Sequence, residues 1–339
     1  MAKKTTKNVT IKDVAAAAGV AVSTVSRVLN NLDRVSDETR EKVQRVADEM
    51  GFVRNTLAAS VKTGRSNMIM VIVPDIINEF YTAVIQGVEE SAVQKGYFTM
   101  VFASNEMQKK EEEFFCGKFG KIVDGVVMIP AHEDLSFVKE YVKPIVIVDR
   151  YVSGSCAEAV IIDNLGGARM LTQELVDNGH KDIAILIGPE MFNIGKERMG
   201  GYTQVMCENG LQIHPEYVKR CTWYAESGYE KTKELLALPN PPSAIFATNN
   251  LLGIGCMQAI VESGLKLGED ISLVCFDDTL MAQYMTPGIT VVKRETVEMG
   301  RLAAEKLIQL IEGEKCSVKE RKIVLPVTLV RRNSVKKLN

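Results

Sequence analysis

The sequence lacks any apolar run of the roughly 18 residues that a transmembrane helix needs. Its lysine-bearing start, MAKKTTKN, is not followed by the apolar segment of a secretory signal. We therefore expect a chain that works in the cytoplasm and has no membrane partner.

Residues that build metal and redox centres are also scarce. The 339 residues include three histidines and seven cysteines, all dispersed, with no Cys-x-x-Cys pair. Reduced thiols are expected, with no metal and no cofactor. No Gly-x-Ser-x-Gly, His-Glu-x-x-His or P-loop signature occurs, so nothing indicates an enzyme.

The charge is distributed unevenly along the chain. Residues 1–65 hold twelve Lys and Arg against seven Asp and Glu, whereas the remainder holds 29 against 36. A basic head on an acidic body indicates that the head binds a polyanion and the body does not. The alternative is that the surface charges are distributed arbitrarily and have no role in binding.

Three short helices are predicted in the basic head. Thr10 caps the first, over residues 9–18, and Gly19 ends it, because glycine tolerates the positive φ of a tight turn. A second helix spans about 22–30, and a third runs from Ser36 to Gly51. This pattern is typical of a helix-turn-helix, although a small three-helix bundle with a solvated face is the alternative. The second helix would point these residues outward: Val22, Ser23, Ser26, Arg27 and Asn30.

From residue 67 the pattern changes to alternating strands and helices. The intervening segments 81–95 and 166–178 have helical periodicity. Near-continuous apolar strands indicate parallel sheets covered on both faces. The predicted strands are 68–73, 98–103, 125–129, 145–148, 183–187, 244–247 and 271–276. Their number favours an α/β body of two doubly wound parallel-sheet subdomains.

Polar and aromatic residues follow the ends of these strands. Ligands bind beyond the carboxyl ends of parallel strands, so these positions are candidates for a cleft between the two halves. They are Asp75, Phe80, Tyr81, Asp149, Asn249, Asn250, Asp277 and Asp278.

The head resembles a known family. The stretches TIKDVAAAAGVAVSTVSRVLNN and VSDETREKVQRVADEMGF are similar to the DNA-binding head of the lactose-repressor (LacI/GalR) family of bacterial transcription regulators. Ala21 departs from the serine that is usual there, which removes a helix-capping hydroxyl. The resemblance implies base-reading positions at Val22, Ser23 and Arg27, and positions near phosphates at Thr10, Thr24, Ser26 and Asn30.

The segment 54–66 resembles the hinge helix of that family, which orders in the minor groove of the operator. The matching DNA-binding positions are Asn55, Ala58 and Val61. Arg54 stands where proline is usual, and Val61 where leucine is usual. A plain flexible linker is the alternative.

The body resembles the same family over residues 67–333 and also resembles periplasmic sugar-binding proteins. The segments that carry this similarity include VPDIINEFY, ERMGGY and GEDISLVCFDDT. The resemblance implies six effector-binding residues: Phe80, Asp149, Arg198, Trp223, Asn249 and Asp277. Carboxylates, amides and a flat indole suit a sugar or sugar acid. Simpler roles remain open, namely a helix cap at Asp277, a surface ion pair at Asp149–Arg150, and packing at Trp223 and Phe80.

These observations predict a periplasmic-binding-protein-like regulator with a helix-turn-helix head. The expected parts are the head (1–53), the hinge (54–66), the body (67–333) and a tail (334–339). Within the body, one subdomain would comprise about 67–163 plus 293–324, and the other 164–292 plus 325–333.

The function expected from the resemblance is repression of a carbohydrate or sugar-acid operon. A homodimer would bind near-palindromic double-stranded operator DNA and respond to a small-molecule effector. One alternative is a global catabolite regulator that answers to a phosphoprotein coregulator. The other is a solute-binding protein without a DNA function.

Overall fold

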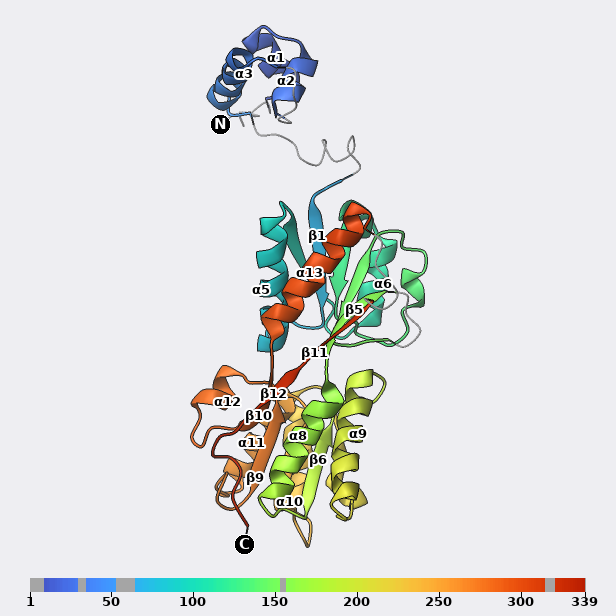
Figure 1. Ribbon diagram of the computed structural model, residues 1–339, viewed down its shortest axis with the longest axis vertical. Helices are drawn as coiled ribbons and strands as arrows, with labels where there is room; N and C mark the ends of the chain where they lie inside the picture. Colours follow the sequence, from blue (N-terminus) through green and yellow to red (C-terminus); the bar gives the residue numbers. More distant parts are fainter. Residues whose placement is uncertain (1–8, 30–34, 53–64, 153–156, 315–320, 339) are drawn as a thin grey trace, which may run out of the picture. The chain divides into compact units, whose positions relative to one another are not determined.

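The computed structural model describes residues 9–29, 35–52, 65–152, 157–314 and 321–338 (Figure 1). The chain divides into two compact units, Met1–Ser66 and Asn67–Asn339. Among the described residues, no helix combines the length and apolarity needed to span a bilayer.

The first unit holds three helices, α1 (Ile11–Ala18), α2 (Val22–Leu29) and α3 (Asp37–Glu49). Thr10 and Asp13 form the predicted capping box, in which the Thr10 N–H donates to Asp13 Oδ2 at 2.8 Å. Gly19 has a φ of 66°, as the predicted turn requires. The helices enclose a small core made of Val14, Ala15, Ala18, Val25, Val28, Val43 and Ala47.

The second unit contains two six-stranded sheets, each in its own lobe. The first lobe has the strand order β11-β5-β4-β3-β1-β2, and all its pairings are parallel. Its strands are β1 (Met68–Val73), β2 (Phe98–Ala103), β3 (Gly125–Met128), β4 (Ile145–Val148), β5 (Glu158–Ile162) and β11 (Lys322–Leu325). Its helices are α5 (Glu79–Gln94), α6 (Gln108–Cys116), α7 (Lys118–Ile122) and α13 (Thr296–Glu312), with a 3₁₀ turn at Ser136–Val138.

The second lobe has the order β12-β10-β9-β8-β6-β7, with only β12 antiparallel to its neighbour. Its strands are β6 (Ile183–Ile187), β7 (Val218–Arg220), β8 (Ala244–Ala247), β9 (Ser272–Phe276), β10 (Thr290–Arg294) and β12 (Val327–Val330). Its helices are α8 (Asn164–Asp177), α9 (Asn193–Glu208), α10 (Ala225–Leu236), α11 (Asn250–Glu262) and α12 (Leu280–Tyr284), with a 3₁₀ turn at Pro215–Tyr217.

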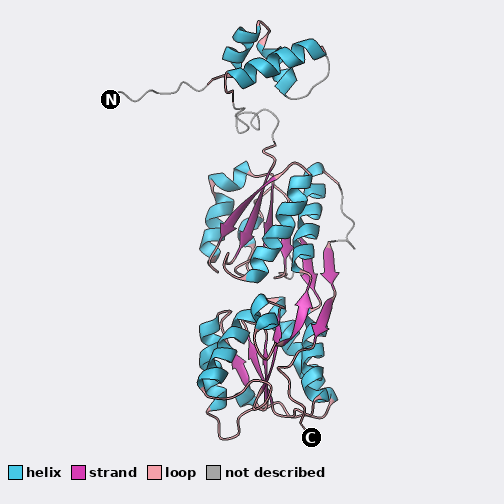
Figure 2. Cartoon of the chain, turned by 90° about the vertical axis from the view of Figure 1, so that its left-hand side faces the viewer, coloured by secondary structure: helices cyan, strands magenta, loops and turns pink. Residues whose placement is uncertain are grey.

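Helices flank both faces of each sheet (Figure 2). Alternate residues of β1 therefore enter different cores. Ile69 and Val71 pack with residues of α5 and α13, whereas Met70 and Ile72 pack with Phe114 of α6. This burial on both sides explains why the strand reads as an unbroken apolar run, and it confirms the predicted fold class.

In the described part of the body, the chain passes between the lobes three times, at Asp163, Glu295 and Pro326. Two of the expected subdomain boundaries, after 292 and after 324, need correction. Lys293 and Arg294 belong to the second lobe because they pair with β12, and Leu325 belongs to the first because it pairs with Ile162.

The expected tail is a packed part of the second lobe up to Leu338. The Ser334 side chain is fully buried, and its hydroxyl donates to the Leu273 carbonyl at 2.6 Å. The Lys336 carbonyl lies 3.1 Å from His180 Nε2, and the Leu338 N–H donates to the Asn178 carbonyl. These backbone groups complete the lobe beyond residue 333.

Candidate effector cleft and DNA-reading helix

Helix α2 turns one face to the core of the head and the other to solvent. Val25 and Val28 are buried, while Val22, Ser23 and Arg27 are exposed and Thr24 and Ser26 are half-buried. Thr10 is exposed, but its hydroxyl donates to Asp13 Oδ2 at 2.6 Å and so is engaged in the cap of α1. The predicted contacts Asn30, Asn55, Ala58 and Val61 lie outside the described residues.

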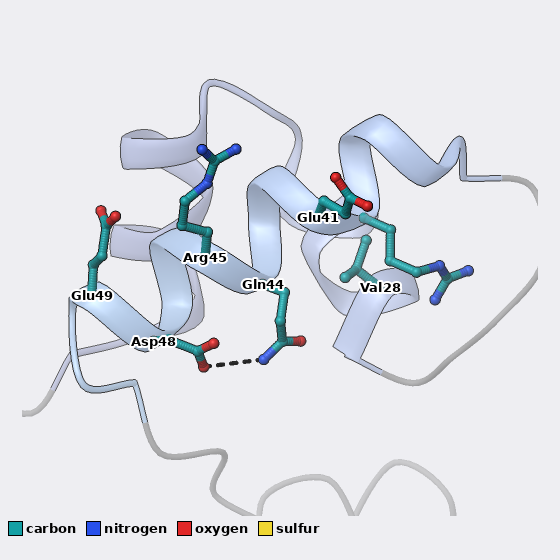
Figure 3. Close-up of a pocket in the computed structure, with 7 residues that line it drawn as sticks. Val28, Glu41, Gln44, Arg45, Asp48 and Glu49 are labelled. Carbon is teal, nitrogen blue, oxygen red and sulfur yellow. Dashed lines mark hydrogen bonds between the residues drawn. The ribbon is translucent and has the colours of Figure 1, made fainter.

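Helix α3 borders a shallow hollow of the head, beside Val28 (Figure 3). Acidic and basic side chains share its lining, and Gln44 Nε2 donates to Asp48 Oδ1 at 3.1 Å, one turn on. Such mixed polar side chains at helical spacing are typical of a solvated face rather than of a ligand site.

All six predicted effector residues line one cavity between the lobes. Phe80 and Asp149 come from the first lobe, and the other four come from the second. The free volume is about 30 Å³, because side chains from both lobes fill most of the cleft. Residues beyond the six also line it: Asn78, Tyr81, Arg150, Ile194, Asn250 and Arg294. That the six bind an effector stays a prediction.

Arg294, at the end of β10, links the two predicted aspartates. Its Nη1 donates to Asp149 Oδ1 at 2.6 Å and its Nε donates to Asp277 Oδ1 at 2.5 Å. Asp149 follows β4 and Asp277 follows β9, and both have a positive φ (64° and 76°). Such backbone strain in non-glycine residues is concentrated at functional sites. The cap of α12 is supplied by Thr279, so the alternative role of Asp277 as a helix cap is wrong.

Arg198, in α9, is 2% exposed and has only neutral hydrogen-bond partners. Its Nε donates to Asn164 Oδ1 at 3.0 Å, its Nη1 donates to the Thr248 carbonyl, and its guanidinium lies over the Phe276 ring. Its buried Nη2 has no partner among the described residues. Burial and the neighbouring charge of Arg294 lower the pKa of Arg198 to about 10.

Arg150 is buried rather than part of the surface ion pair considered as an alternative. Both of its terminal nitrogens donate to the Glu106 carboxylate at 2.6 Å. Its guanidinium carbon lies 4.9 Å from the centre of the Phe192 ring and 5.0 Å from that of Trp223. Sequence reasoning named neither Arg150 nor Arg294 as a cleft residue, and only the Asp149–Arg150 dipeptide hinted at the first.

Trp223 and Asn249 are fixed by the second lobe. The Asn249 amide donates to the Trp223 carbonyl at 3.0 Å, and its Oδ1 caps α11 by accepting from Leu252 N–H. A Cβ on Gly188 would lie 2.4 Å from the Trp223 ring, so the absence of a side chain there makes room for the indole. Phe80 lies beneath the Arg294 guanidinium at 3.7 Å. Both aromatic rings therefore pack against arginines of the cleft.

A helix-turn-helix head joined to a two-lobed body with a buried polar cavity defines the class of ligand-responsive DNA-binding regulators. Residues 10–55 match the family described as "Bacterial regulatory proteins, lacI family", and residues 172–335 match a "Periplasmic binding protein-like domain".

Characterised relatives extend this match over the whole chain. The HTH-type transcriptional regulator DegA of Bacillus subtilis (strain 168) is 35% identical, over 97% of this chain and 99% of its own length. The HTH-type transcriptional repressor CytR of Escherichia coli (strain K12) is 32% identical, over 92% of this chain and 93% of its own.

Solved structures agree. The lac repressor dimer bound to operator and the anti-inducer ONPF superimposes with a TM-score of 0.87 at 27% identity, covering 97% of this chain and all of that one. The complex of the regulator CelR with cellobiose gives 0.73 at 30% identity, covering 96% and 99%. The chain belongs to the lacI family of bacterial regulatory proteins. It is a DNA-binding transcriptional regulator and not an enzyme.

Proposed function

We propose that this regulator is a repressor that binds a near-palindromic operator as a homodimer in the bacterial cytoplasm, and that a sugar or sugar acid in the cleft changes its operator affinity. The observation that carries the effector proposal is the cavity between the lobes, where the six predicted residues converge. In domain terms, we propose a head (1–53), a hinge (54–66) and an effector-binding body from residue 67.

The cleft chemistry supports a polyhydroxylated ligand. Arg198 Nη2 is a buried donor without a partner, and Asp277 Oδ2 is a buried acceptor without one among the described residues. A hydroxyl group can accept from the first and donate to the second. A ligand carboxylate would pair with the Arg198 guanidinium, and for this reason sugar acids are included with neutral sugars.

The head supports sequence-specific DNA binding. On α2, Val22, Ser23 and Arg27 are exposed and are proposed to read base edges. The half-buried Thr24 and Ser26, together with Thr10 and Asn30, are proposed to lie near phosphates. An arginine can donate to guanine O6 and N7 in the major groove. The hinge contacts Asn55, Ala58 and Val61 belong to the same proposal.

The first lobe supports the homodimer. Strand β2 is an edge strand of its sheet, and it exposes Phe98 (72%), Met100 (37%) and Val101 (45%). Apolar edge strands favour association with another chain unless they are covered. A second copy is the occupant that we propose, because a near-palindromic operator requires two heads.

Effector binding would change the angle between the lobes. The three passages between them, at Asp163, Glu295 and Pro326, allow a hinge motion while keeping each sheet intact. The lobe angle would then set the spacing of the paired hinges on DNA. An effector can shift this equilibrium only through its different affinity for the two arrangements.

The deciding experiment is selection of bound sequences from a random DNA pool by the full-length protein at fixed salt, because phosphate contacts alone give unspecific affinity. We expect a near-palindrome to be enriched. Arg27→Ala should lower affinity for it by about 1–3 kcal/mol per half-site, whereas Arg45→Ala, an exposed arginine of α3, should have a small effect.

The selected operator then serves to screen sugars and sugar acids for a change in affinity. No enrichment, or enrichment that Arg27→Ala leaves untouched, would contradict the DNA-binding proposal. An operator complex that answers only to a phosphorylated protein partner, and to no sugar, would favour the global catabolite regulator instead.

A further inference from the structure

The first lobe holds one arginine that lines the cleft, Arg150, through four hydrogen bonds. Besides its two bonds to Glu106, Arg150 donates to the Tyr81 hydroxyl and to the Pro130 carbonyl, each at 3.0 Å. All these partners belong to the first lobe, and Arg150 is 2% exposed. The first lobe alone therefore fixes the guanidinium.

The rings that Arg150 meets belong to the second lobe. Phe192 precedes α9, and Trp223 follows β7. The Trp223 ring also packs closely against Gly188 of the second lobe, where a Cβ would lie 2.4 Å from it. A buried cation beside two aromatic rings is attracted to both, so this contact draws the lobes together.

Arg294 makes the reciprocal arrangement. Its bond to Asp277 lies within the second lobe, whereas its bond to Asp149 and its stacking on Phe80 reach the first. It is 7% exposed. Charge-assisted hydrogen bonds of this kind are about twice as strong as neutral ones. Two other bonds across the cleft among the described residues are weaker candidates: a neutral pair, Asn78–Asn250, and an exposed bond from Leu280 N–H to Glu79.

We propose that Arg150 and Arg294 are positioning residues that form a reciprocal clasp, each fixed in its own lobe and bound to the other, and that this clasp sets the closure of the cleft. A ligand that stacks on Trp223 competes with Arg150, and one that binds Asp149 and Asp277 competes with Arg294. Because Arg150 is tied to its lobe by four hydrogen bonds, separating it from Trp223 moves the second lobe. Effector binding and lobe movement are then one event.

The test uses Trp223, the only tryptophan of the chain, as the reporter. Acrylamide quenching of its fluorescence in the full-length protein measures how accessible the cleft is. Arg294 stacks on Phe80 and bonds to the two aspartates, not to Trp223, so its replacement acts on Trp223 through lobe separation. We expect Arg294→Met to raise the quenching constant about twofold or more, and Arg294→Lys to restore part of the wild-type value.

Two further variants keep the test decisive. Arg294→Met alone leaves two buried carboxylates unpaired. A triple variant therefore combines Arg294→Met with Asp149→Asn and Asp277→Asn. Asparagine is chosen because it tolerates a positive φ. The matched control is Arg332→Met, which removes a 2.6 Å ion pair with Asp278 inside the second lobe. Wild-type quenching in the folded triple variant, or an equal rise in Arg332→Met, would overturn the clasp.

The effect of the clasp on regulation rests on the proposed function. Operator affinity is therefore measured on the same variants. Raised quenching with unchanged operator affinity would retain the clasp and refute its regulatory role. A failure of operator binding by the wild type would instead count against the proposed function, and the quenching result would stand.

Discussion

Glu111, in α6, is a fully buried carboxyl group near Arg150 and Glu106. Burial raises its pKa to about 7, against the lowering effect of the hydrogen bond from Ala131 N–H at 2.9 Å. Its Oε2 has no partner among the described residues. The folded state therefore favours the protonated acid, and ionising Glu111 costs stability.

The sign of the pH dependence follows from the raised pKa. Between the ordinary pKa of 4.5 and the folded value of about 7, the folded chain binds more protons at this site than the unfolded chain, so stability falls as pH rises. Glu111→Gln removes this cost. Its stability relative to the wild type should increase by about 2–3 kcal/mol between pH 4.5 and 7.5 in urea unfolding.

The control for this prediction is Glu113→Gln, an exposed residue of the same helix. It should show no such pH-dependent gain. A gain for Glu111→Gln that is the same at pH 4.5 and 7.5 would contradict the titration of Glu111 in this range.

The six predicted cleft residues were found from strand ends and family similarity, but their partners were not. Glu106 lies 44 residues before Arg150 in the chain, and Arg294 ends a strand that the sequence did not indicate. Which charges pair in the cleft depends on how segments distant in sequence come together, within a lobe for Arg150 and between lobes for Arg294, and this is not encoded in local periodicity. The prediction that the flat Trp223 indole suits a sugar did not include Arg150, which lies over that ring.

At the scale of elements, the packing of α8 against α9 depends on one of two adjacent glycines whose surroundings differ. A Cβ on Gly201 would lie 2.5 Å from the Leu165 carbonyl oxygen and 2.7 Å from the Ala168 Cβ. A Cβ on Gly200 would meet only Leu165 Cδ1, at 3.8 Å. Gly201 therefore allows the two helices to pack closely, whereas at Gly200 there is room for a side chain.

Alanine substitutions at these two positions should therefore differ in sign. Gly201→Ala should destabilise the body by about 1–3 kcal/mol, because it forces the helices apart. Gly200→Ala should be neutral or stabilise by up to about 1 kcal/mol, since alanine is the better helix former. Urea unfolding of the two variants measures both, and similar values for the pair would show that helix contact does not determine the effect.

The same scale explains which strands were predictable. The seven predicted runs are all strands, because parallel strands buried on two faces are apolar throughout. The strands β5, β7, β10, β11 and β12 were not predicted. Lysine interrupts the apolar pattern in β7, β10 and β11. In addition, β7, β11 and β12 are the edge strands of their sheets, so their side chains are less completely buried. Their short or mixed sequences do not stand out from loops.

For the whole molecule, the exposed apolar edge of β2 leads to a prediction about assembly. Val101→Lys places a charge on the strand that a second copy would cover. We expect the dimer dissociation constant to rise at least about tenfold in sedimentation, with operator affinity falling in parallel. Val142→Lys, at a 94% exposed position away from this strand, is the control. Equal dissociation of both variants would place the dimer contact elsewhere.

The interleaved lobes also determine the order in which parts of the protein can form during synthesis. The first sheet needs β11 and the second needs β10, β12 and the packed residues up to Leu338, so neither lobe is complete until the last fifty residues emerge. The head needs only residues up to about Phe52 for its core. On the ribosome, the head can therefore fold and become able to bind DNA well before either lobe of the body is complete. A chain cut short before β11 would leave both sheets incomplete and retain the head, whereas one cut just after β11 would leave only the second sheet incomplete.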